Sequence, residues 1–441
     1  MYVKFAMFKD CLEIDYSVLH NNMKILWITN ILFPEAEHLL TGNGELKASG
    51  GWMLGAAEAL LLQPNIKLTV ATVSTKVKSL TRLEGNRITY YVLPMGRGNQ
   101  RMNPEYEPLW KHVKSEVRPD VVHIHGTEFS HGHAYMRACG SDNVVVSIQG
   151  MTSAYYYYYY GMSKSDVYKN LTLRDILRGS IIAGQRQFKK RSEYEVEMLR
   201  MAHHVIGRTS WDRTHVWAIN PEAEYHFCNE TLRPEFYDGS KWSYEKCRKH
   251  SIFLSQAGYP IKGLHQLLKA MPLILSHYPD TTIRVAGGDI TKCDSFKDWL
   301  HFSGYGRYIK NLIHRLHMAG KVEFIGNKNA EEMKHEYLAS NVFVCPSTIE
   351  NSPNSLGEAQ ILGVPCVASY VGGIPDMMKG NEDNLYRFEE IDMLAEKVCR
   401  VFAAKKCKKQ LIDMSSIAQM RHEQKKNSDT LFTIYQSIFG V

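Results

Sequence analysis

Short apolar runs that alternate with helix-like segments constrain the fold of this 441-residue chain more than any other feature. In the first half, the apolar runs occupy residues 24–30, 68–74, 88–93, 119–126 and 143–149. They show little polar alternation, which is typical of strands buried on both faces of a parallel sheet. Helix-like segments between them, such as residues 108–117, would cover both faces of that sheet. The first half therefore predicts an α/β domain built on parallel strands.

The second half of the chain repeats this alternation. Its apolar runs occupy residues 251–255, 281–286, 322–326, 341–347 and 366–370. The linker between the two halves, near residues 230–250, is a candidate hinge. Ligands of parallel sheets bind beyond the carboxyl ends of the strands. Two such domains facing each other would therefore form a cleft lined by the strand ends of both halves.

Composition and charge exclude several other classes of protein. The chain is 44% hydrophobic and 22% charged, which is typical of a soluble globular protein, and no apolar run approaches the roughly 20 residues that span a bilayer. Residues 1–22 lack the uninterrupted apolar core of a signal peptide, so we expect a cytoplasmic protein. The nine cysteines form no Cys-x-x-Cys pair or His/Cys cluster at metal spacing, which favours reduced thiols. The net charge of +7 is mild, and no nucleic-acid-binding motif accompanies it.

Two glutamates eight residues apart, Glu350 and Glu358, mark the most informative segment. The predicted strand at 341–347 runs directly into Glu350, and Glu358 lies in the helix-like segment that follows. The start of a helix offers free backbone N–H groups to an anionic ligand, and carboxylates accept hydrogen bonds from hydroxyl groups. A nucleotide sugar carries both phosphates and hydroxyls. The alternative is that both acids are solvated surface residues.

Three motifs together resemble one protein family. They are the Glu350-x(7)-Glu358 element, Lys262-Gly263 upstream of it, and the loop at residues 372–376, Gly-Gly-Ile-Pro-Asp, downstream. The chain resembles the retaining glycosyltransferases of family 4, nearly throughout from Met23 and most strongly between residues 251 and 388. The resemblance implies the GT-B architecture, with two facing Rossmann-like domains and a cleft between them. The implied divisions are an N-terminal extension (1–22), an acceptor-binding domain (23–235), a donor-binding domain (236–415) and a C-terminal helix that crosses back to the first domain (416–441).

The resemblance also implies roles for individual residues. Lys262 would hold the diphosphate of the donor, Glu350 would bind hydroxyls of the transferred sugar, and His125 would reach that sugar from the first domain. Glu358 would clamp the ribose. The remaining implied donor-binding residues are Gln256, Pro353, Asn354, Ser355, Leu356, Gly50 and Gly51. No metal or other cofactor is expected, and the sequence shows no Asp-x-Asp motif for the cleft.

One position departs from the family pattern. The family usually carries an arginine five or six residues before the lysine, where this chain has Gln256 and Ala257. Gln256 donates a hydrogen bond but carries no charge, so another cation is needed to match the family site, and Arg208 and Arg233 are candidates. The departure keeps open the alternative of a non-catalytic homologue that binds nucleotide sugars. A second alternative is a GT-B sugar-nucleotide epimerase, which would use the same cleft.

An aromatic and basic segment, residues 155–191, is the last unusual feature. Six consecutive tyrosines, 155–160, are followed by lysines and arginines interspersed with apolar residues. Such a segment suits an acceptor sugar or an anionic membrane surface, and it equally suits an aromatic loop followed by a solvated helix face. By resemblance, we predict transfer of a sugar to a glycan or lipid-linked acceptor in bacterial surface polysaccharide biosynthesis. The protein would then work in the cytoplasm, with peripheral contact at the inner face of the plasma membrane.

Overall fold

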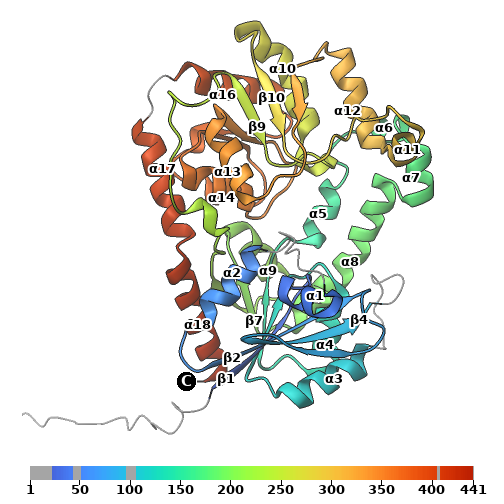
Figure 1. The fold of residues 1–441 in the computed structure, drawn as a ribbon, viewed down its shortest axis with the longest axis vertical. Helices are drawn as coiled ribbons and strands as arrows, with labels where there is room; N and C mark the ends of the chain where they lie inside the picture. The colour runs from blue at the N-terminus through green and yellow to red at the C-terminus, as the bar shows by residue number, and fades with distance from the viewer. Residues whose placement is uncertain (1–21, 43–50, 96–105, 405–407, 441) are drawn as a thin grey trace, which may run out of the picture.

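The computed structural model describes residues 22–42, 51–95, 106–404 and 408–440, and these form two β-sheets covered by helices (Figure 1). The first sheet has eight strands in the order β3-β4-β2-β1-β5-β6-β7-β8, and the second has six in the order β11-β10-β9-β12-β13-β14. Within the sheets, neighbouring strands run parallel except for the antiparallel pair β3–β4. The predicted α/β class with two parallel-sheet domains is thereby confirmed. The predicted N-terminal extension lies outside the described residues, apart from residue 22.

The first sheet and its helices extend from Met23 to Phe227. Its strands are β1 (Met23–Ile28), β2 (Ile66–Ser74), β3 (Thr81–Glu84), β4 (Ile88–Pro94), β5 (Val121–His125), β6 (Val144–Ser147), β7 (His204–Gly207) and β8 (Glu224–Phe227). The helices are α1 (Pro34–Thr41), α2 (Gly51–Leu60), α3 (Tyr106–Val117), α4 (Ser130–Cys139), α5 (Thr152–Tyr158), α6 (Lys164–Lys169), α7 (Leu173–Arg178), α8 (Ile181–Met201) and α9 (Ser210–Ile219).

The second sheet begins after a linker that contains the short 3₁₀ helix η2 (Pro234–Phe236). Its strands are β9 (Ser251–Leu254), β10 (Thr282–Val285), β11 (Val322–Phe324), β12 (Val342–Cys345), β13 (Cys366–Ser369) and β14 (Leu385–Tyr386). Its helical elements are η3 (Pro260–Lys262), α10 (Leu264–His277), α11 (Phe296–His301), α12 (Gly304–Arg315), α13 (Ala330–Ala339), α14 (Asn354–Leu362), α15 (Ile374–Met377), η4 (Glu382–Asn384) and α16 (Ile391–Ala403). The last two helices are α17 (Lys408–Arg421) and α18 (Gln424–Phe439).

Burial on both faces explains the continuous apolar runs in the sequence. In β1, Leu26 and Ile28 join the apolar core on one face of the first sheet, and Ile25 and Trp27 join the core on the other. Successive side chains of a strand point to opposite faces, so a strand covered on both sides needs an apolar residue at every position. The second sheet likewise separates two cores, to which Ile252 and Phe253 of β9 contribute on opposite faces.

The C-terminal helix α18 belongs to the core of the first sheet rather than the second. It lies beside α2 (Figure 1), and its Tyr435 is fully buried. The hydroxyl of Tyr435 accepts a hydrogen bond from the Trp27 indole at 2.9 Å and lies 2.5 Å from Nδ1 of His123. The end of the chain therefore supplies both packing and hydrogen bonds to the first domain.

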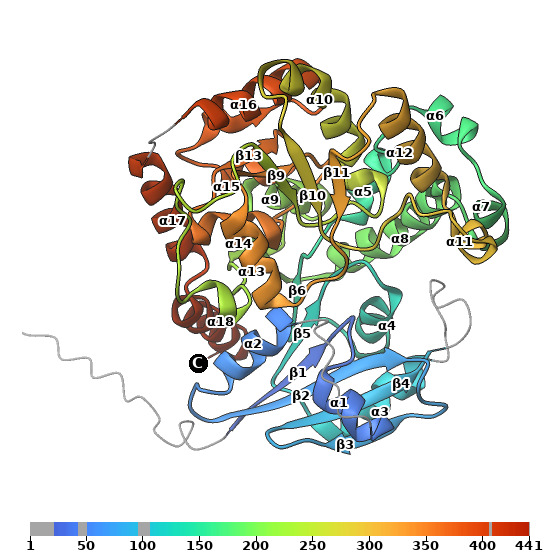
Figure 2. The same cartoon turned by 45° about the horizontal axis from the view of Figure 1, so that its top comes forward.

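Helices α6 and α7 make the reverse connection, from the first half of the chain to the second. They precede β7 of the first sheet, yet α6 contacts α12 and α7 contacts α11 of the second half (Figures 1 and 2). The Asp175 carboxylate accepts a hydrogen bond from the Gly304 amide at 2.8 Å, and Arg307 donates to the Leu171 carbonyl at 2.9 Å. The two halves are thus joined by side-chain and backbone contacts as well as by the linker.

Candidate donor site

A cavity of about 840 Å³, which we call the donor cavity after its predicted ligand, opens at the carboxyl ends of β9 and β12, where the sequence predicts ligand binding. Seven of the predicted site residues line it: Gln256, Lys262, Glu350, Pro353, Asn354, Ser355 and Glu358. Leu356 is instead fully buried in the core behind the cavity. Gly51 is the first residue of α2, and Gly50 lies outside the described residues. Residues of this cavity that were not predicted include Ser255, Asn327, Lys328 and Ser347.

The Lys262-Gly263 pair occupies a tight position against the end of β12. Gly263 has a φ of +72°, in the left-handed region that favours glycine, and a Cβ built there would lie 1.6 Å from the Pro346 carbonyl oxygen. The chain can therefore approach β12 this closely only with glycine. This approach brings the preceding residue, Lys262, to the wall of the cavity beside the Glu350 loop.

Lys262 and Glu350 form an ion pair in the cavity. The Lys262 Nζ lies 2.6 Å from Glu350 Oε1, which also accepts a hydrogen bond from the Ser347 hydroxyl at 2.9 Å. Burial disfavours the charged form of Lys262, but the Glu350 carboxylate outweighs this effect and holds the pKa of Lys262 above its ordinary value. Lys262 is therefore a permanent cation at neutral pH.

The Gly-Gly loop after β13 supports the backbone of Glu350. The Gly373 amide donates to the Glu350 carbonyl at 3.0 Å. Gly372 has a φ of +53°, and a Cβ there would lie 1.9 Å from that same carbonyl oxygen. These glycines explain the motif in physical terms, because any side chain on Gly372 would push the loop away from Glu350.

Glu358 is clamped by an arginine from the linker. Arg233 donates from Nε and NH2 to the two carboxylate oxygens of Glu358, at 2.8 and 2.9 Å. The Tyr337 hydroxyl lies 3.4 Å from Glu358 Oε2. Burial raises the pKa of Glu358, and the guanidinium of Arg233 opposes that rise. Of the two arginines that the sequence offered as substitute cations, Arg233 lines the donor cavity.

The amino end of α14 gives the cavity a second source of positive potential. The cap residue Pro353 makes no side-chain capping bond, and Asn354 and Ser355 line the cavity in the first turn. The first N–H groups of a helix have no intrahelical partner, and the helix dipole favours anions at this end. Together with Lys262, which lines the same cavity, this arrangement can bind a diphosphate.

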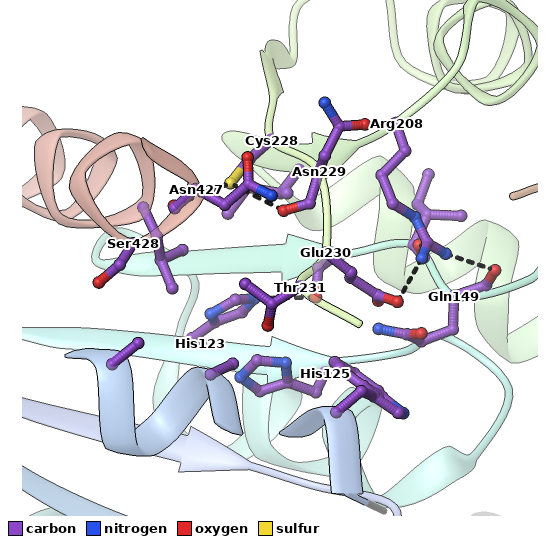
Figure 3. Close-up of a pocket in the computed structure, with 17 residues that line it drawn as sticks. His123, His125, Gln149, Arg208, Cys228, Asn229, Glu230, Thr231, Asn427 and Ser428 are labelled. Atoms are coloured by element: carbon purple, nitrogen blue, oxygen red, sulfur yellow. Dashed lines mark hydrogen bonds and ion pairs between the residues drawn. The ribbon is translucent and has the colours of Figure 1, made fainter. Parts of the chain in front are cut away.

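His125 lies at a different place from the other predicted catalytic residues. It lines a small cavity of about 60 Å³ at the carboxyl edge of the first sheet, together with Gln149, Arg208 and Glu230 (Figure 3). Its ring stacks on His123 at 3.7 Å between centroids, and its buried Nε2 has no hydrogen-bond partner. Burial lowers the pKa of His125 to about 3, so the ring is neutral. The role of His125 at a donor sugar stays a prediction.

Arg208, the other candidate cation, is held inside the first domain. Its guanidinium forms an ion pair with Glu230 at 2.5 Å and donates to the carbonyls of Ile148 and Gln149 at 3.1 and 3.0 Å (Figure 3). It is only 6% exposed. These contacts join the end of β6 to the start of the linker, although the buried Nε of Arg208 has no hydrogen-bond partner. Arg208 is not among the residues that line the donor cavity.

Sequence reasoning missed a carboxylate near His125. The Glu128 side chain follows β5 and accepts hydrogen bonds from the Gly150 amide at 3.0 Å and from the Asn30 side chain at 3.3 Å. Burial, reinforced by the nearby Glu195 charge, raises the pKa of Glu128 to about 7. The only sequence signal was its place just after a predicted strand.

The two domains meet beside the donor cavity. Asn351, next to Glu350, donates to the Asp212 carboxylate at 2.9 Å, and its side-chain oxygen accepts from the Thr209 hydroxyl at 2.8 Å. All three side chains are buried, and Asp212 also caps α9. The loop that carries Glu350 is therefore positioned by the first domain as well as the second.

The tyrosine run borders a second large cavity. Residues 155–158 are helical within α5, and Tyr157, Tyr158 and Tyr160 line a cavity of about 950 Å³ between the two halves. The opposite wall comes from α10 and from the segments after β13 and β14, and it includes Lys269 and Arg387. An aromatic wall facing cationic and hydrogen-bonding groups is a surface that can bind a polar ring-shaped ligand.

Comparisons with known proteins agree with this architecture. The chain is similar to the solved structure of sucrose-phosphate synthase from Thermosynechococcus elongatus, with a TM-score of 0.69 and 15% identity over 95% of this chain and 99% of that one. It is also similar to Anabaena HepE in complex with UDP and glucose, with a TM-score of 0.59 and 15% identity over 94% and 100% of the two chains. These likenesses define the fold as GT-B.

The sequence comparisons each cover only part of the chain. Residues 242–416 match the family described as glycosyl transferases group 1. An uncharacterized glycosyltransferase of Methanocaldococcus jannaschii is 28% identical over 156 residues, which is 35% of this chain and 36% of that protein. A D-inositol 3-phosphate glycosyltransferase of Corynebacterium urealyticum is 32% identical over 120 residues, 26% and 25% of the two chains. The matches thus span about a third or less of these relatives. The resemblance to glycosyltransferase family 4 is confirmed at the level of this domain and the fold.

Within the described residues, no helix is both long enough and apolar enough to cross a bilayer.

Proposed function

We propose that the protein is a retaining glycosyltransferase that moves a sugar from a nucleoside-diphosphate donor to a hydroxyl group of an acceptor. The observation that carries this proposal is the donor cavity, which is lined both by Lys262 and by the amino end of α14 and where Glu350 and Glu358 supply carboxylates. The Lys262 cation and the amino end of α14 suit a diphosphate, and the two carboxylates suit the hydroxyls of the sugar and the ribose.

The chemistry follows from what the cavity can stabilise. The bond between the anomeric carbon and the diphosphate oxygen breaks while a bond to the acceptor oxygen forms on the same face. The departing diphosphate takes the acceptor proton, so no side chain is needed as a covalent nucleophile. Lys262 and the α14 amides stabilise the charge that develops on the leaving group, an effect worth about 3–4 kcal/mol per donor in comparable oxyanion sites.

Arg233 is the proposed substitute for the arginine missing at Gln256 and Ala257. It lines the donor cavity, it is 26% exposed at the side chain, and its partner Glu358 is the proposed ribose clamp. A guanidinium bound to that carboxylate both orients the clamp and adds a positive charge near the diphosphate. This arrangement places the second cation on the linker instead of on the loop after β9.

The donor is tested by binding. Solved neighbours were determined with UDP and glucose and with UDP-2-fluoro glucose, so UDP-sugars are the first to test. UDP-, GDP- and ADP-sugars should be compared by calorimetry on the wild type and Glu358→Ala. Saturable binding that Glu358→Ala removes supports the donor site, and equal binding by both proteins contradicts it. Binding without transfer indicates a non-catalytic homologue, and a new epimer formed without acceptor indicates an epimerase.

The acceptor is proposed to be a glycan or lipid-linked sugar in surface polysaccharide assembly. The tyrosine-lined cavity supports this proposal, because aromatic rings stack on the apolar faces of sugars while their hydroxyls form hydrogen bonds. The reaction would take place in the cytoplasm, at the inner face of the plasma membrane. Product analysis by NMR after incubation with membrane extract would test both the acceptor and the retained anomeric configuration.

An exposed apolar patch supports contact with an anionic membrane. We define the α7–α11 patch as Leu173, Ile176 and Leu177 of α7 with Phe296 and Trp299 of α11. These side chains are exposed, Ile176 by 76% and Phe296 by 73%, and their helices are in contact (Figure 2). Exposed basic residues lie on or near the same helices: Lys169, Arg178, Lys292 and Lys297. Apolar side chains with surrounding cations fit a bilayer surface that carries negative lipids.

Vesicle binding tests this patch. The wild type should sediment with phosphatidylglycerol vesicles and much less with phosphatidylcholine vesicles, because the attraction is electrostatic as well as apolar. Ile176→Glu combined with Phe296→Glu should abolish sedimentation. Leu62→Glu is the matched control, since Leu62 is 80% exposed outside the patch. Sedimentation of the double variant at the wild-type level would contradict membrane contact through this surface.

A further inference from the structure

Three residues of types that can bind a metal ion, His204, Glu224 and His226, cluster at the edge of the first sheet, outside both large cavities. Strands β7 and β8 pair in parallel, with His204 opposite Glu224 and with His226 two residues further along β8. Residues two apart on a strand share a face, so Glu224 and His226 point to the same side of the sheet. His204, on the neighbouring strand, completes the cluster.

The distances within the cluster suit a bound ion. Nδ1 of His204 lies 3.1 Å from Nε2 of His226 and 3.5 Å from Glu224 Oε2, and all three residues offer ligand atoms within 4.8 Å of one another. Zinc binds histidine nitrogens at about 2.0–2.1 Å, so ligand atoms of a tetrahedral site stand about 3.3 Å apart. The ligand atoms are thus already close to the separation that a tetrahedral ion needs.

The three residues of the cluster differ in their exposure to solvent. Both imidazoles are mostly buried, with side-chain exposures of 19% for His204 and 11% for His226, whereas Glu224 is 63% exposed. The exposed glutamate leaves one side of the cluster open to solvent, where a water molecule can complete four-coordination.

We propose that His204, Glu224 and His226 form a zinc-type divalent metal site with one open position. The cluster starts at the first residues of β7 and β8, whereas ligands of the donor cavity bind beyond the carboxyl ends of the second sheet. It is therefore separate from the proposed transfer chemistry. An ion here would tie the edge strand β8, which has only β7 as a neighbour in the described sheet, to the rest of the domain.

The site is tested with the full chain after treatment with chelator. Titration with ZnCl₂ by calorimetry should show one saturable site, and Co²⁺ should give the visible absorption bands of a four-coordinate ion. His204→Ala and His226→Ala should each weaken Zn²⁺ binding by more than about tenfold, because loss of even an outer-shell partner costs 10–100-fold. His203→Ala is the matched control, since His203 is an exposed neighbour, 62% at the side chain, whose contact with Asp142 is 4.0 Å long.

The readouts also distinguish a metal site from a simple pair of hydrogen-bonded rings. In the absence of metal, one imidazole N–H can donate to the other ring at 3.1 Å. If that hydrogen bond is the whole role of the cluster, Zn²⁺ will show no saturable binding, and the proposal is overturned. Binding that persists in His204→Ala/His226→Ala, or that His203→Ala weakens equally, overturns it as well. Circular dichroism of each variant ensures that lost binding does not reflect lost folding.

Discussion

Lys262 Nζ and Glu350 Oε1 lie 2.6 Å apart, so the cation proposed for the diphosphate is bound to the carboxylate proposed for the sugar. The Ser347 hydroxyl holds the same oxygen at 2.9 Å. A bound diphosphate would compete with Glu350 for Lys262 and leave the carboxylate available to sugar hydroxyls. The ion pair thereby keeps both charges compensated before a donor binds, and it would link phosphate binding to sugar binding.

Replacing Lys262 should affect turnover more than donor binding. Lys262→Ala is expected to lower kcat by about 10²–10³-fold, as for loss of one oxyanion donor, because the charge on the leaving diphosphate grows in the transition state. Steady-state kinetics and calorimetry separate kcat from donor Kd. Lys425→Ala is the control, since its partner Asp429 lies on the surface of α18. A variant with wild-type kcat would contradict the role of Lys262.

Replacing Glu358 should weaken donor binding and leave Arg233 without its carboxylate partner. Glu358→Ala is expected to weaken donor affinity by more than about tenfold, since hydrogen bonds to a charged group contribute about 1.5–3 kcal/mol. It should also destabilise the fold, because breaking a buried ion pair costs about 3–5 kcal/mol. Urea unfolding of the variant measures this second effect separately. The donor affinities of Glu358→Ala and the wild type are therefore compared without denaturant, under conditions where the variant is fully folded.

The role of Arg233 as the second cation can be tested by moving the arginine from position 233 to position 256. Arg233→Met should lower kcat, and adding Gln256→Arg to that variant should restore part of the loss, because both positions line the donor cavity. Partial restoration measured by initial rates supports a shared role for the two positions. No loss in Arg233→Met would show that the α14 amides and Lys262 suffice.

The close contact at Gly263 should make it intolerant of a side chain. Gly263→Ala is expected to destabilise the protein by much more than Gly320→Ala, although φ is +72° at one and +73° at the other. A Cβ at Gly320 meets open space, whereas one at Gly263 lies 1.6 Å from the Pro346 carbonyl oxygen. The left-handed conformation alone costs about 1–2 kcal/mol, so the difference in urea unfolding free energy reports the clash. Equal losses would contradict this packing.

Glu128 should make stability fall as the pH rises. Burial raises the pKa of Glu128 to about 7 in the folded protein, from 4.5 in its ordinary range. Between these two pKa values, the folded state therefore binds one more proton than the unfolded state. The stability that this proton contributes is fully present below about pH 4.5 and is lost as the pH rises through 7. Glu128→Gln should show a smaller drop in unfolding free energy between pH 5 and pH 7.5 than the wild type. An identical drop in both proteins would rule out Glu128 as the source.

Much of the fold could be predicted because strands buried on both faces leave a continuous apolar run. The runs at 24–30 and 251–255 correspond to β1 and β9 in this way. The edge strand β8, Glu-Tyr-His-Phe, is exposed or half-buried at each position and has no such run, so its sequence gave no strand signal. The two-residue strand β14 is too short to carry a pattern.

The candidate site likewise contains residues that a local sequence pattern predicts and residues that it does not. Residues near Glu350 could be predicted as a group because local spacing after a strand places them together. The Arg233–Glu358 pair joins residues 125 positions apart, and the Asn351–Asp212 contact joins residues 139 apart. No local pattern marks such partners, since only the packing of the two domains brings them together.

The packing of α18 means that the first domain is discontinuous in sequence. A fragment that ended after Phe227 would contain every strand of the first sheet but would lose Tyr435, exposing Trp27 and leaving its indole N–H without its protein acceptor. During synthesis, the first domain cannot complete its core until the second has been made. The first domain therefore completes its folding only when α18 has been synthesised. A truncation that removes only the final turns of α18 would damage the domain formed by the beginning of the chain.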